Sequence, residues 1–306
     1  MKILVFTEKP FAPAAVKAIE NVVNASGNEI EVVEGGTKED LYKAIVGANA
    51  LIVRSDKVDA NVMDAGAPTL KVIVRAGAGY DNIDLEAATK RGICVMNTPG
   101  QNSNAVAELV FGMMVMMCRN QYNGKSGSEL KGKSLGIYAF GQVGRNVARI
   151  AKGFDMKIEA LDVFVADDVM EAEGVKPVHD VNELFSDNDF VSLHIPATPQ
   201  TKGSIGYDLV MRMPKGGVLV NTARKEVIDE DGLLKALEER PDLRYVSDIK
   251  PDKAEEFEKK FADRVFFTPK KMGAQTAEAN FNAGVAAAEQ CVAYLKDGWN
   301  KYQVNK

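Results

Sequence analysis

The chain of 306 residues is 46% hydrophobic and 26% charged, proportions typical of a globular protein with one large or two medium domains. Its 38 Lys and Arg against 43 Asp and Glu give a formal net charge of −5, which argues against nucleic acid as the main partner. No apolar run reaches membrane-spanning length, and the N-terminus lacks the apolar region of a signal peptide, so we expect a cytoplasmic protein with no membrane partner.

The first hundred residues alternate between short apolar runs and helical patterns. Repeated strand–helix units of this kind predict a parallel sheet with helices on both faces. We expect strands at residues 2–6, 30–33, 50–53, 72–75 and 94–97, with helices between them at residues such as 14–23, 38–46 and 85–90.

A long helix is predicted to begin at Ser103. One of its faces carries apolar residues at i, i+3, i+4, i+7, i+8 and i+11, which is the helical period. These residues are Val106, Leu109, Val110, Met113, Met114 and Met117. A methionine-rich stripe is more often core or subunit interface than cofactor site, so we expect core packing and a homodimer contact. A polar, glycine-rich loop is expected to follow at residues 120–133.

Residues 134–162 have the order strand, glycine-rich turn, helix, strand that a dinucleotide-binding site requires. The turn is Ala139-Phe140-Gly141-Gln142-Val143-Gly144, with Ala in place of the usual first Gly. Its backbone N–H groups and the helix N-terminus would bind a pyrophosphate, which makes Ala139, Gly141, Gln142 and Val143 cofactor-binding candidates. Ala139 can serve there if its φ is negative.

Asp162 ends the second strand of this unit, where a carboxylate can accept the ribose hydroxyls. An acid at this position would repel a 2′-phosphate, and no Arg or Lys stands in residues 163–166. The sequence therefore predicts NAD as the cofactor in preference to NADP.

The alternation continues after Asp162 and ends in a long helix. Further strands are expected at residues 189–194, 217–222, 244–248 and 265–268, and a helix at about 277–296 is expected to pack back on the first domain. We therefore predict an α/β protein of two doubly wound parallel-sheet domains. Residues 1–98 and 277–306 would form a discontinuous substrate-binding domain, and residues 99–276 a dinucleotide-binding domain.

Polar residues stand where several of these strands end, and ligands of parallel α/β sheets bind at that edge. Arg54 and Arg75 end neighbouring strands, and Arg75 precedes the small-residue turn Ala76-Gly77. Two cations and free backbone N–H groups in one place predict an anion site. His194, Arg224, Asp248 and the pair Lys270-Lys271 end or follow the later strands.

The three cysteines, Cys94, Cys118 and Cys291, stand apart in apolar surroundings. Buried free thiols are the usual state of such residues in a cytosolic protein. No zinc-type spacing is present, and we expect no metal site.

Three stretches resemble the D-2-hydroxyacid dehydrogenase family, most closely its phosphoglycerate-oxidising members. They are RAGAGYDNIDLEAATKRGICVMNTPGQNSNAVAEL, HIPATPQTKGSIG and VLVNTARKEVID. The resemblance implies a flavodoxin-like substrate domain and a Rossmann NAD domain. Because the chain stops at Lys306, it resembles the short members without a C-terminal regulatory domain.

The resemblance also implies roles for single residues. Arg224 matches the Arg that holds the substrate carboxylate and carbonyl, and Ala76 and Gly77 match backbone donors to that carboxylate. Positions near the phosphate end of the substrate are matched by Arg54, Arg75 and Asn102. Asp248 matches the Asp beside the nicotinamide carboxamide. The remaining cofactor-lining positions are matched by His194, Pro196, Thr201, Thr222 and Ala223.

The chain departs from the family at its acid/base pair. The usual His after a Thr-Pro dipeptide is replaced in Thr268-Pro269-Lys270, and its usual Glu partner corresponds to Lys253. A Lys-containing subtype of the family shows the same substitution. A neutral lysine can take the proton of a 2-hydroxy acid, so Lys270 is the predicted acid/base, although the spacing does not separate it from Lys271.

We therefore expect NAD-dependent oxidation of a small phosphorylated 2-hydroxy acid, with Arg224 and Lys270 as catalytic residues. Two alternatives stay open. One is a hydroxypyruvate or glyoxylate reductase on the same fold, and the other is a dinucleotide-sensing protein without turnover, because fold alone does not decide function.

Overall fold

The computed structural model describes residues 1–305. Its contacts divide the chain into two compact units. Unit 1 consists of Met1–Asn102 together with the segment that begins at Thr276, and unit 2 is Ser103–Gln275. The chain therefore leaves unit 1 once and returns to it once, and each unit has a sheet and core of its own.

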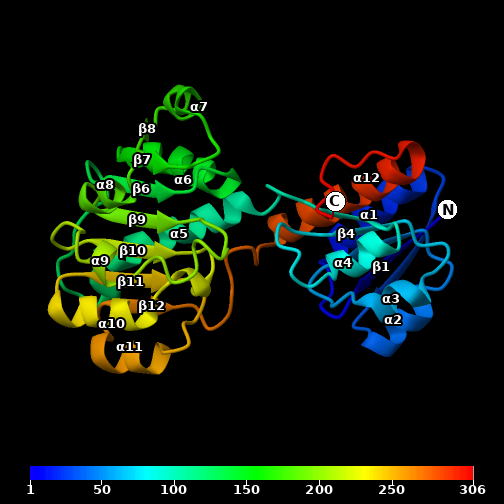
Figure 1. The fold of residues 1–306 in the computed structure, drawn as a ribbon, viewed down its shortest axis with the longest axis horizontal. Helices are drawn as coiled ribbons and strands as arrows, with labels where there is room; N and C mark the ends of the chain where they lie inside the picture. Colours follow the sequence, from blue (N-terminus) through cyan, green and yellow to red (C-terminus); the bar gives the residue numbers. More distant parts are fainter. Residues whose placement is uncertain (306) are drawn as a thin grey trace. The chain divides into compact units, whose positions relative to one another are not determined.

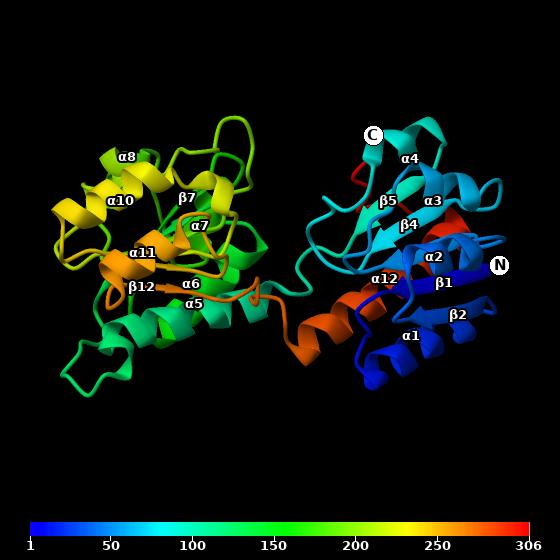
Figure 2. The same cartoon turned by 90° about the horizontal axis from the view of Figure 1, so that it is seen from below.

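Unit 1 is built on a five-stranded parallel sheet of order β2-β1-β3-β4-β5. Figures 1 and 2 show its helices on both sides of the sheet. The strands are β1 (Lys2–Thr7), β2 (Glu29–Glu34), β3 (Ala50–Val53), β4 (Val72–Arg75) and β5 (Cys94–Asn97), and the helices are α1 (Pro13–Ala25), α2 (Lys38–Ala44), α3 (Ala60–Ala65), α4 (Leu85–Lys90) and α12 (Ala277–Asp297).

Alternate residues of β1 supply the two halves of the unit 1 core, because successive side chains of a strand point to opposite faces. Ile3 and Val5 pack with α1 and α12, which lie against each other. Leu4 and Phe6 pack with α2, α3 and α4 on the other face. The last helix thus belongs to the core of the first domain, as its sequence predicts.

Unit 2 is built on a seven-stranded parallel sheet of order β12-β11-β10-β9-β6-β7-β8, and Figure 1 shows the strands in this sequence. The strands are β6 (Ser134–Tyr138), β7 (Lys157–Leu161), β8 (Lys176–Pro177), β9 (Phe190–Leu193), β10 (Val218–Asn221), β11 (Arg244–Ser247) and β12 (Val265–Phe267). The chain order reverses between β6 and β9, and such a switch point is where open α/β sheets bind ligands.

Helices cover both faces of this sheet. One face carries α5 (Ser103–Cys118) and α6 (Gln142–Gly153), and the other carries α8 (Val181–Ser186), α9 (Tyr207–Val210), α10 (Glu230–Glu239) and α11 (Ala254–Phe261). Figure 2 shows α5 and α10 on opposite sides of the sheet. A short α7 (Asp167–Ala172) packs beside β8, and two 3₁₀ turns, η1 (Asn120–Tyr122) and η2 (Lys225–Val227), complete the unit.

The predicted fold class of two parallel-sheet α/β domains is confirmed, and every strand predicted for the first hundred residues is found. The methionine-rich face of α5 is buried in the unit 2 core, so the prediction that this face also makes a dimer contact is wrong. The homodimer itself stays a prediction. The loop predicted at residues 120–133 begins with η1. All three cysteines are buried and free.

Across residues 1–305, none of the helices has the length and apolar character needed to cross a bilayer. The same residues contain no cluster of His, Cys, Asp and Glu side chains that could hold a metal ion.

Candidate functional site

The turn between β6 and α6 has the shape that a bound pyrophosphate requires. Gly141 is the N-cap of α6, and no side-chain hydrogen bond caps the helix there. A Cβ built on Gly141 would meet no atom within 4 Å, so the space beside the helix N-terminus is open. A Cβ on Gly144 would lie 2.3 Å from the Ala139 carbonyl oxygen, so this glycine lets the helix approach the strand. The turn therefore fits the phosphates of a dinucleotide.

The expectation of a negative φ at Ala139 is wrong. Its φ is +82°, not negative, so the first fingerprint position has a left-handed backbone although it carries a side chain. The chain must turn sharply from β6 into α6 here, and the flanking amides are held in place. The Ala139 N–H donates to the Leu161 carbonyl at 2.8 Å, and the Phe140 N–H donates to the Asp162 carboxylate at 2.7 Å. Such a backbone costs about 1–2 kcal/mol for a residue with a Cβ.

Asp162 supports the cofactor turn as well as standing at the ribose position. Its Oδ2 accepts the Phe140 N–H, and its Oδ1 accepts the Phe164 N–H at 2.8 Å. The two bonds join the glycine-rich turn to the loop after β7. A carboxylate oxygen can accept more than one hydrogen bond, so Asp162 keeps capacity for a ribose hydroxyl.

His194 lies at the end of β9, between side chains of two neighbouring strand ends. Its Nε2 lies 2.9 Å from Ser192 Oγ, and its Nδ1 lies 3.3 Å from Thr222 Oγ1. Burial lowers the pKa of His194 to about 3. The imidazole is therefore neutral at physiological pH and serves as a hydrogen-bonding group, not as an acid.

The predicted cofactor-lining residues after His194 lie in a short ordered loop. Thr201 Oγ1 donates to the Pro196 carbonyl at 2.5 Å and accepts the Thr198 N–H at 2.8 Å. The structure thus places Pro196 in contact with Thr201, and His194 in contact with Thr222.

Asn221 fixes the turn that carries Arg224. This buried side chain ends β10, and its Oδ1 accepts the Ala223 N–H at 3.0 Å while its Nδ2 donates to the Arg224 carbonyl at 2.9 Å. Arg224 Nη1 in turn donates to the Ala223 carbonyl at 2.9 Å. The sequence analysis did not name Asn221 as a candidate site residue, although it is a polar residue at a strand end.

Asp248, at the end of β11, fixes the loop that carries the two lysines. Its buried carboxylate accepts the N–H groups of Met272 and Gly273, both at 2.7 Å, and the Thr268 hydroxyl at 3.2 Å. The sequence analysis did not name Gly273, and it named Thr268 only as part of the Thr-Pro dipeptide before Lys270.

Lys271, not Lys270, lies beside Arg224. Lys271 Nζ donates to the Ala223 carbonyl at 3.3 Å, the same oxygen that Arg224 Nη1 contacts. Lys270 is exposed. Lys253, at the position of the usual Glu, instead forms an ion pair with Asp231 of α10.

The candidate anion residues of unit 1 are held by other parts of that unit. Arg54 donates from Nη1 to the carbonyls of Lys9 and Pro10 and from Nη2 to Asn280 Oδ1 at 2.5 Å, and it lies over the Phe11 ring. Burial lowers the pKa of Arg54, but a guanidinium stays charged in proteins. Arg75 Nε donates to the Arg54 carbonyl at 2.9 Å, so the Arg75 guanidinium lies against the backbone of Arg54.

Gly77 makes room for the Arg75 guanidinium. Its φ is +147°, and a Cβ on Gly77 would lie 1.3 Å from Arg75 Nη1. Glycine suits this position, because any side chain here would displace the Arg75 guanidinium.

The expectation of free N–H groups at Ala76 and Gly77 is wrong for this structure. The Ala76 N–H donates to the Val53 carbonyl at 2.8 Å, because it continues the pairing of β3 and β4, and the Gly77 N–H donates to the Arg75 carbonyl at 2.9 Å in a tight turn. Asn102, the last residue of this part of unit 1, is half-buried in the turn before α5.

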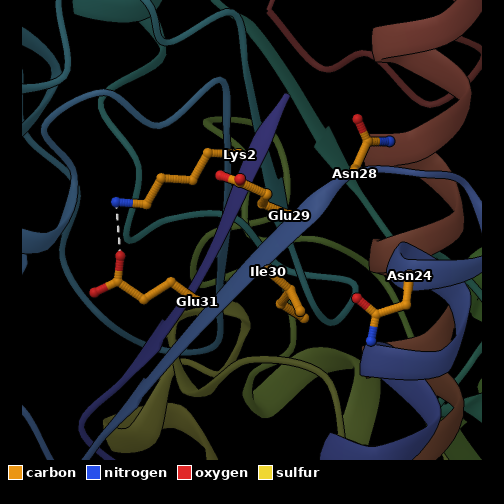
Figure 3. Close-up of a pocket in the computed structure, with 6 residues that line it drawn as sticks. All are labelled: Lys2, Asn24, Asn28, Glu29, Ile30 and Glu31. Atoms are coloured by element: carbon orange, nitrogen blue, oxygen red, sulfur yellow. Dashed lines mark ion pairs between the residues drawn. The ribbon is translucent and has the colours of Figure 1, made fainter.

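A hollow beside β2 includes none of the predicted site residues (Figure 3). Its lining consists of Lys2, Asn24, Asn28, Glu29, Ile30 and Glu31, and Lys2 forms an ion pair with Glu31 at 2.6 Å. Lys2 and Glu29 begin their strands, so the hollow adjoins the amino ends of β1 and β2. Ligands of parallel sheets bind at the opposite ends.

The chain is similar to known 2-hydroxyacid dehydrogenases. Residues 105–270 match the D-isomer specific 2-hydroxyacid dehydrogenase NAD binding domain. A D-3-phosphoglycerate dehydrogenase of Methanocaldococcus jannaschii is 39% identical over 311 residues, which cover 97% of this chain and 58% of that enzyme. This chain thus spans little more than half of that relative. A hydroxypyruvate reductase of Thermotoga maritima is 37% identical over 282 residues, which cover 86% of this chain and 90% of that enzyme.

Among solved structures, 3-phosphoglycerate dehydrogenase of Entamoeba histolytica with NAD+ bound is similar over the whole chain. It is 48% identical, has a TM-score of 0.89, and is covered over 99% of its length. The family match extends over more than half of the present chain and includes the glycine-rich turn, Asp162, Arg224 and Asp248. The chain therefore belongs to the D-isomer specific 2-hydroxyacid dehydrogenases, and its residues 105–270 form the NAD-binding domain of that family.

Proposed function

We propose that the chain catalyses the NAD-dependent oxidation of 3-phospho-D-glycerate to 3-phosphohydroxypyruvate. The observation that carries the proposal is that the side chains of Arg224 and Lys271 both donate a hydrogen bond to the Ala223 carbonyl oxygen. A cation for a carboxylate and an amine for a proton are side by side at the carboxyl ends of β10 and β12. The phosphoglycerate dehydrogenases among the relatives support the choice of substrate.

The cofactor site favours NAD. The open space beside Gly141 admits the pyrophosphate, and the Asp162 carboxylate can bind ribose hydroxyls but would repel a 2′-phosphate. When bound, NAD accepts a hydride from C2 of the substrate.

The protein supplies orientation and proton transfer. Arg224 would hold the substrate carboxylate through charge-assisted hydrogen bonds. A neutral lysine amine takes the proton of the C2 hydroxyl, the electrons of the O–H bond form the C=O bond, and the electrons of the C2–H bond leave with the hydrogen as hydride. In the reverse direction the charged lysine returns the proton to the keto oxygen.

Two arginines of unit 1 suit the phosphate end of this substrate. Arg54 and Arg75 are neighbours through the Arg54 carbonyl, and we propose that with Asn102 they bind the phosphate. We also propose a cytoplasmic homodimer that acts at the entry to serine biosynthesis.

Reduction of hydroxypyruvate or glyoxylate is the second candidate. The hydroxypyruvate reductase of Thermotoga maritima is related over 90% of its length. In addition, Arg54 already donates to two carbonyls and to Asn280, which leaves fewer of its N–H groups for a phosphate.

The test is turnover of the purified chain with both substrate classes. We expect NADH to appear with 3-phosphoglycerate at alkaline pH. Arg75→Met should raise KM for the phosphorylated substrate by roughly 10- to 100-fold, the loss expected for a charged hydrogen bond, while Lys90→Met on the surface of α4 should leave it unchanged. Activity with hydroxypyruvate alone would favour the reductase, and NADH binding without any turnover would favour the dinucleotide sensor.

A further inference from the structure

The buried carboxylate of Asp248 accepts hydrogen bonds from the loop that follows β12. Charged groups inside a protein must be hydrogen-bonded, since an unpaired one is very costly. Here both oxygens are satisfied by the loop after β12, through the Met272 N–H, the Gly273 N–H and the Thr268 hydroxyl. The contacts fix the loop at its start and immediately after its two lysines.

Gly273 permits this arrangement. A Cβ on Gly273 would lie 2.7 Å from Asp248 Oδ2 and 3.2 Å from Val106 Cγ2, so any larger residue would push the loop off the carboxylate. The fit between Asp248 and Gly273 therefore sets the path of the chain at residues 271–273.

The same loop meets the Arg224 turn through Lys271. Lys271 directly precedes the two amides that Asp248 holds, and its Nζ reaches the Ala223 carbonyl. On the other side, Asn221 fixes Ala223 and Arg224. Two buried polar side chains at adjacent strand ends thus hold the two turns that present a cation and an amine.

We propose that Asp248 is a positioning residue whose carboxylate holds residues 268–273 so that Lys271, not Lys270, is the proton-transferring group. This inference rests on the proposed function and names its acid/base. The family resemblance implies that Asp248 lies beside the nicotinamide, and the present inference adds that its carboxylate positions the loop. Lys271 lies next to Arg224, which would hold the substrate carboxylate one bond from C2.

Lysine substitutions test the identity of the acid/base. We expect Lys271→Ala to lower kcat by at least about 100-fold, the usual contribution of a positioned acid or base, and to lower it far more than Lys270→Ala does. Added ethylamine should restore part of the rate of Lys271→Ala in proportion to its neutral form. A larger loss of kcat in Lys270→Ala than in Lys271→Ala, or rescue by ethylamine of Lys270→Ala only, would overturn the assignment.

Gly273→Ala tests the positioning role without altering Asp248 itself. The added methyl should displace the loop and lower kcat by roughly 10- to 100-fold, because a misplacement of about 1 Å can cost that much, with little change in KM for NAD. The matched control is Gly112→Ala on the exposed face of α5, where a Cβ would meet no atom within 4 Å. If Gly273→Ala keeps wild-type kcat, Asp248 does not act through the loop.

Hydrogen exchange of the intact chain separates this inference from the proposed function. We expect Asp248→Asn to speed exchange of the Met272 and Gly273 amides at least about 10-fold, with no change at residues 222–224. If the wild-type protein shows no turnover with any substrate, the proposed function is wrong. The exchange rates would still show whether Asp248 holds the loop. Unchanged exchange in Asp248→Asn would contradict the positioning role.

Discussion

At the scale of single residues, two backbone positions show how the site is built. Ala139 adopts a left-handed backbone that glycine would adopt freely, and Gly77 gives the Arg75 guanidinium a space that no side chain could share. The first position carries strain and the second avoids a clash. Each makes a prediction for one substitution.

Ala139→Gly should stabilise unit 2. Relief of the left-handed strain exceeds the extra entropy of an unfolded glycine, and the net gain should be about 0.5–1 kcal/mol. Thermal or denaturant unfolding of wild type and variant measures it. Ala172→Gly at the end of α7 is the control and should give no gain, because its φ is not left-handed. A loss of stability at Ala139 would show that the turn relaxes to negative φ in solution.

Gly77→Ala should weaken substrate binding. The methyl would occupy the place of Arg75 Nη1, so the guanidinium must leave, and KM for the phosphorylated substrate should rise at least about 10-fold. Gly92→Ala controls for backbone strain, since Gly92 also has a positive φ but open space around it. Equal effects of the two variants on KM would contradict a role for the Arg75 position.

At the scale of secondary-structure elements, the site is a row of parallel strand ends. Asn221 is the last residue of β10, and His194 and Asp248 directly follow β9 and β11. The side chains of His194 and Asn221 contact the turn after β10, and the side chain of Asp248 contacts the loop after β12. The strands place these groups next to each other because parallel strands end at one edge of the sheet.

His194 makes the stability of unit 2 dependent on pH. Its folded-state pKa is about 3, against about 6.5 in the unfolded chain, so between these values the unfolded state binds one more proton. The free energy of unfolding should therefore fall as pH decreases from 6.5 towards 3, by up to about 1.4 kcal/mol per pH unit.

Denaturant unfolding of wild type and His194→Gln checks this slope. Between pH 7.5 and pH 5 the wild type should lose about 2 kcal/mol more than the variant, which carries no titrating group at this position. Both proteins keep the same carboxylates, so the difference isolates the histidine. Parallel pH profiles would show that His194 is not buried in its neutral form.

At the scale of the whole molecule, the candidate site residues are distributed over the two units. Unit 2 carries the dinucleotide turn, Arg224 and the lysines, and unit 1 carries the two neighbouring arginines. Each unit has a core and a sheet of its own, so a ligand that binds one unit should stabilise that unit first.

NAD should therefore raise the unfolding temperature of unit 2 more than NADP does. A ligand at 100 times its Kd stabilises the folded state by about 2.7 kcal/mol, and the Asp162 carboxylate opposes a 2′-phosphate. Differential scanning calorimetry with each cofactor measures the shift. Equal shifts for NAD and NADP would contradict the role assigned to Asp162.

Much of the fold follows from local sequence. The strands at residues 50–53, 72–75 and 94–97 are found within the expected bounds, because short apolar runs between turn residues specify buried parallel strands. The sequence also predicted that Arg75, His194 and Asp248 lie at the ends of strands, since a polar residue that ends or directly follows a buried strand lies at the edge of its sheet.

Only the tertiary structure decided the contacts between these ends. The φ of Ala139 depends on the hydrogen bonds of Leu161 and Asp162, and the N–H of Ala76 is used by Val53. The difference between Lys270 and Lys271 depends on Asp248 and on a carbonyl 48 residues away. Local pattern fixes which residues reach the edge of the sheet, but hydrogen bonds between distant segments determine which groups meet there and which are already satisfied.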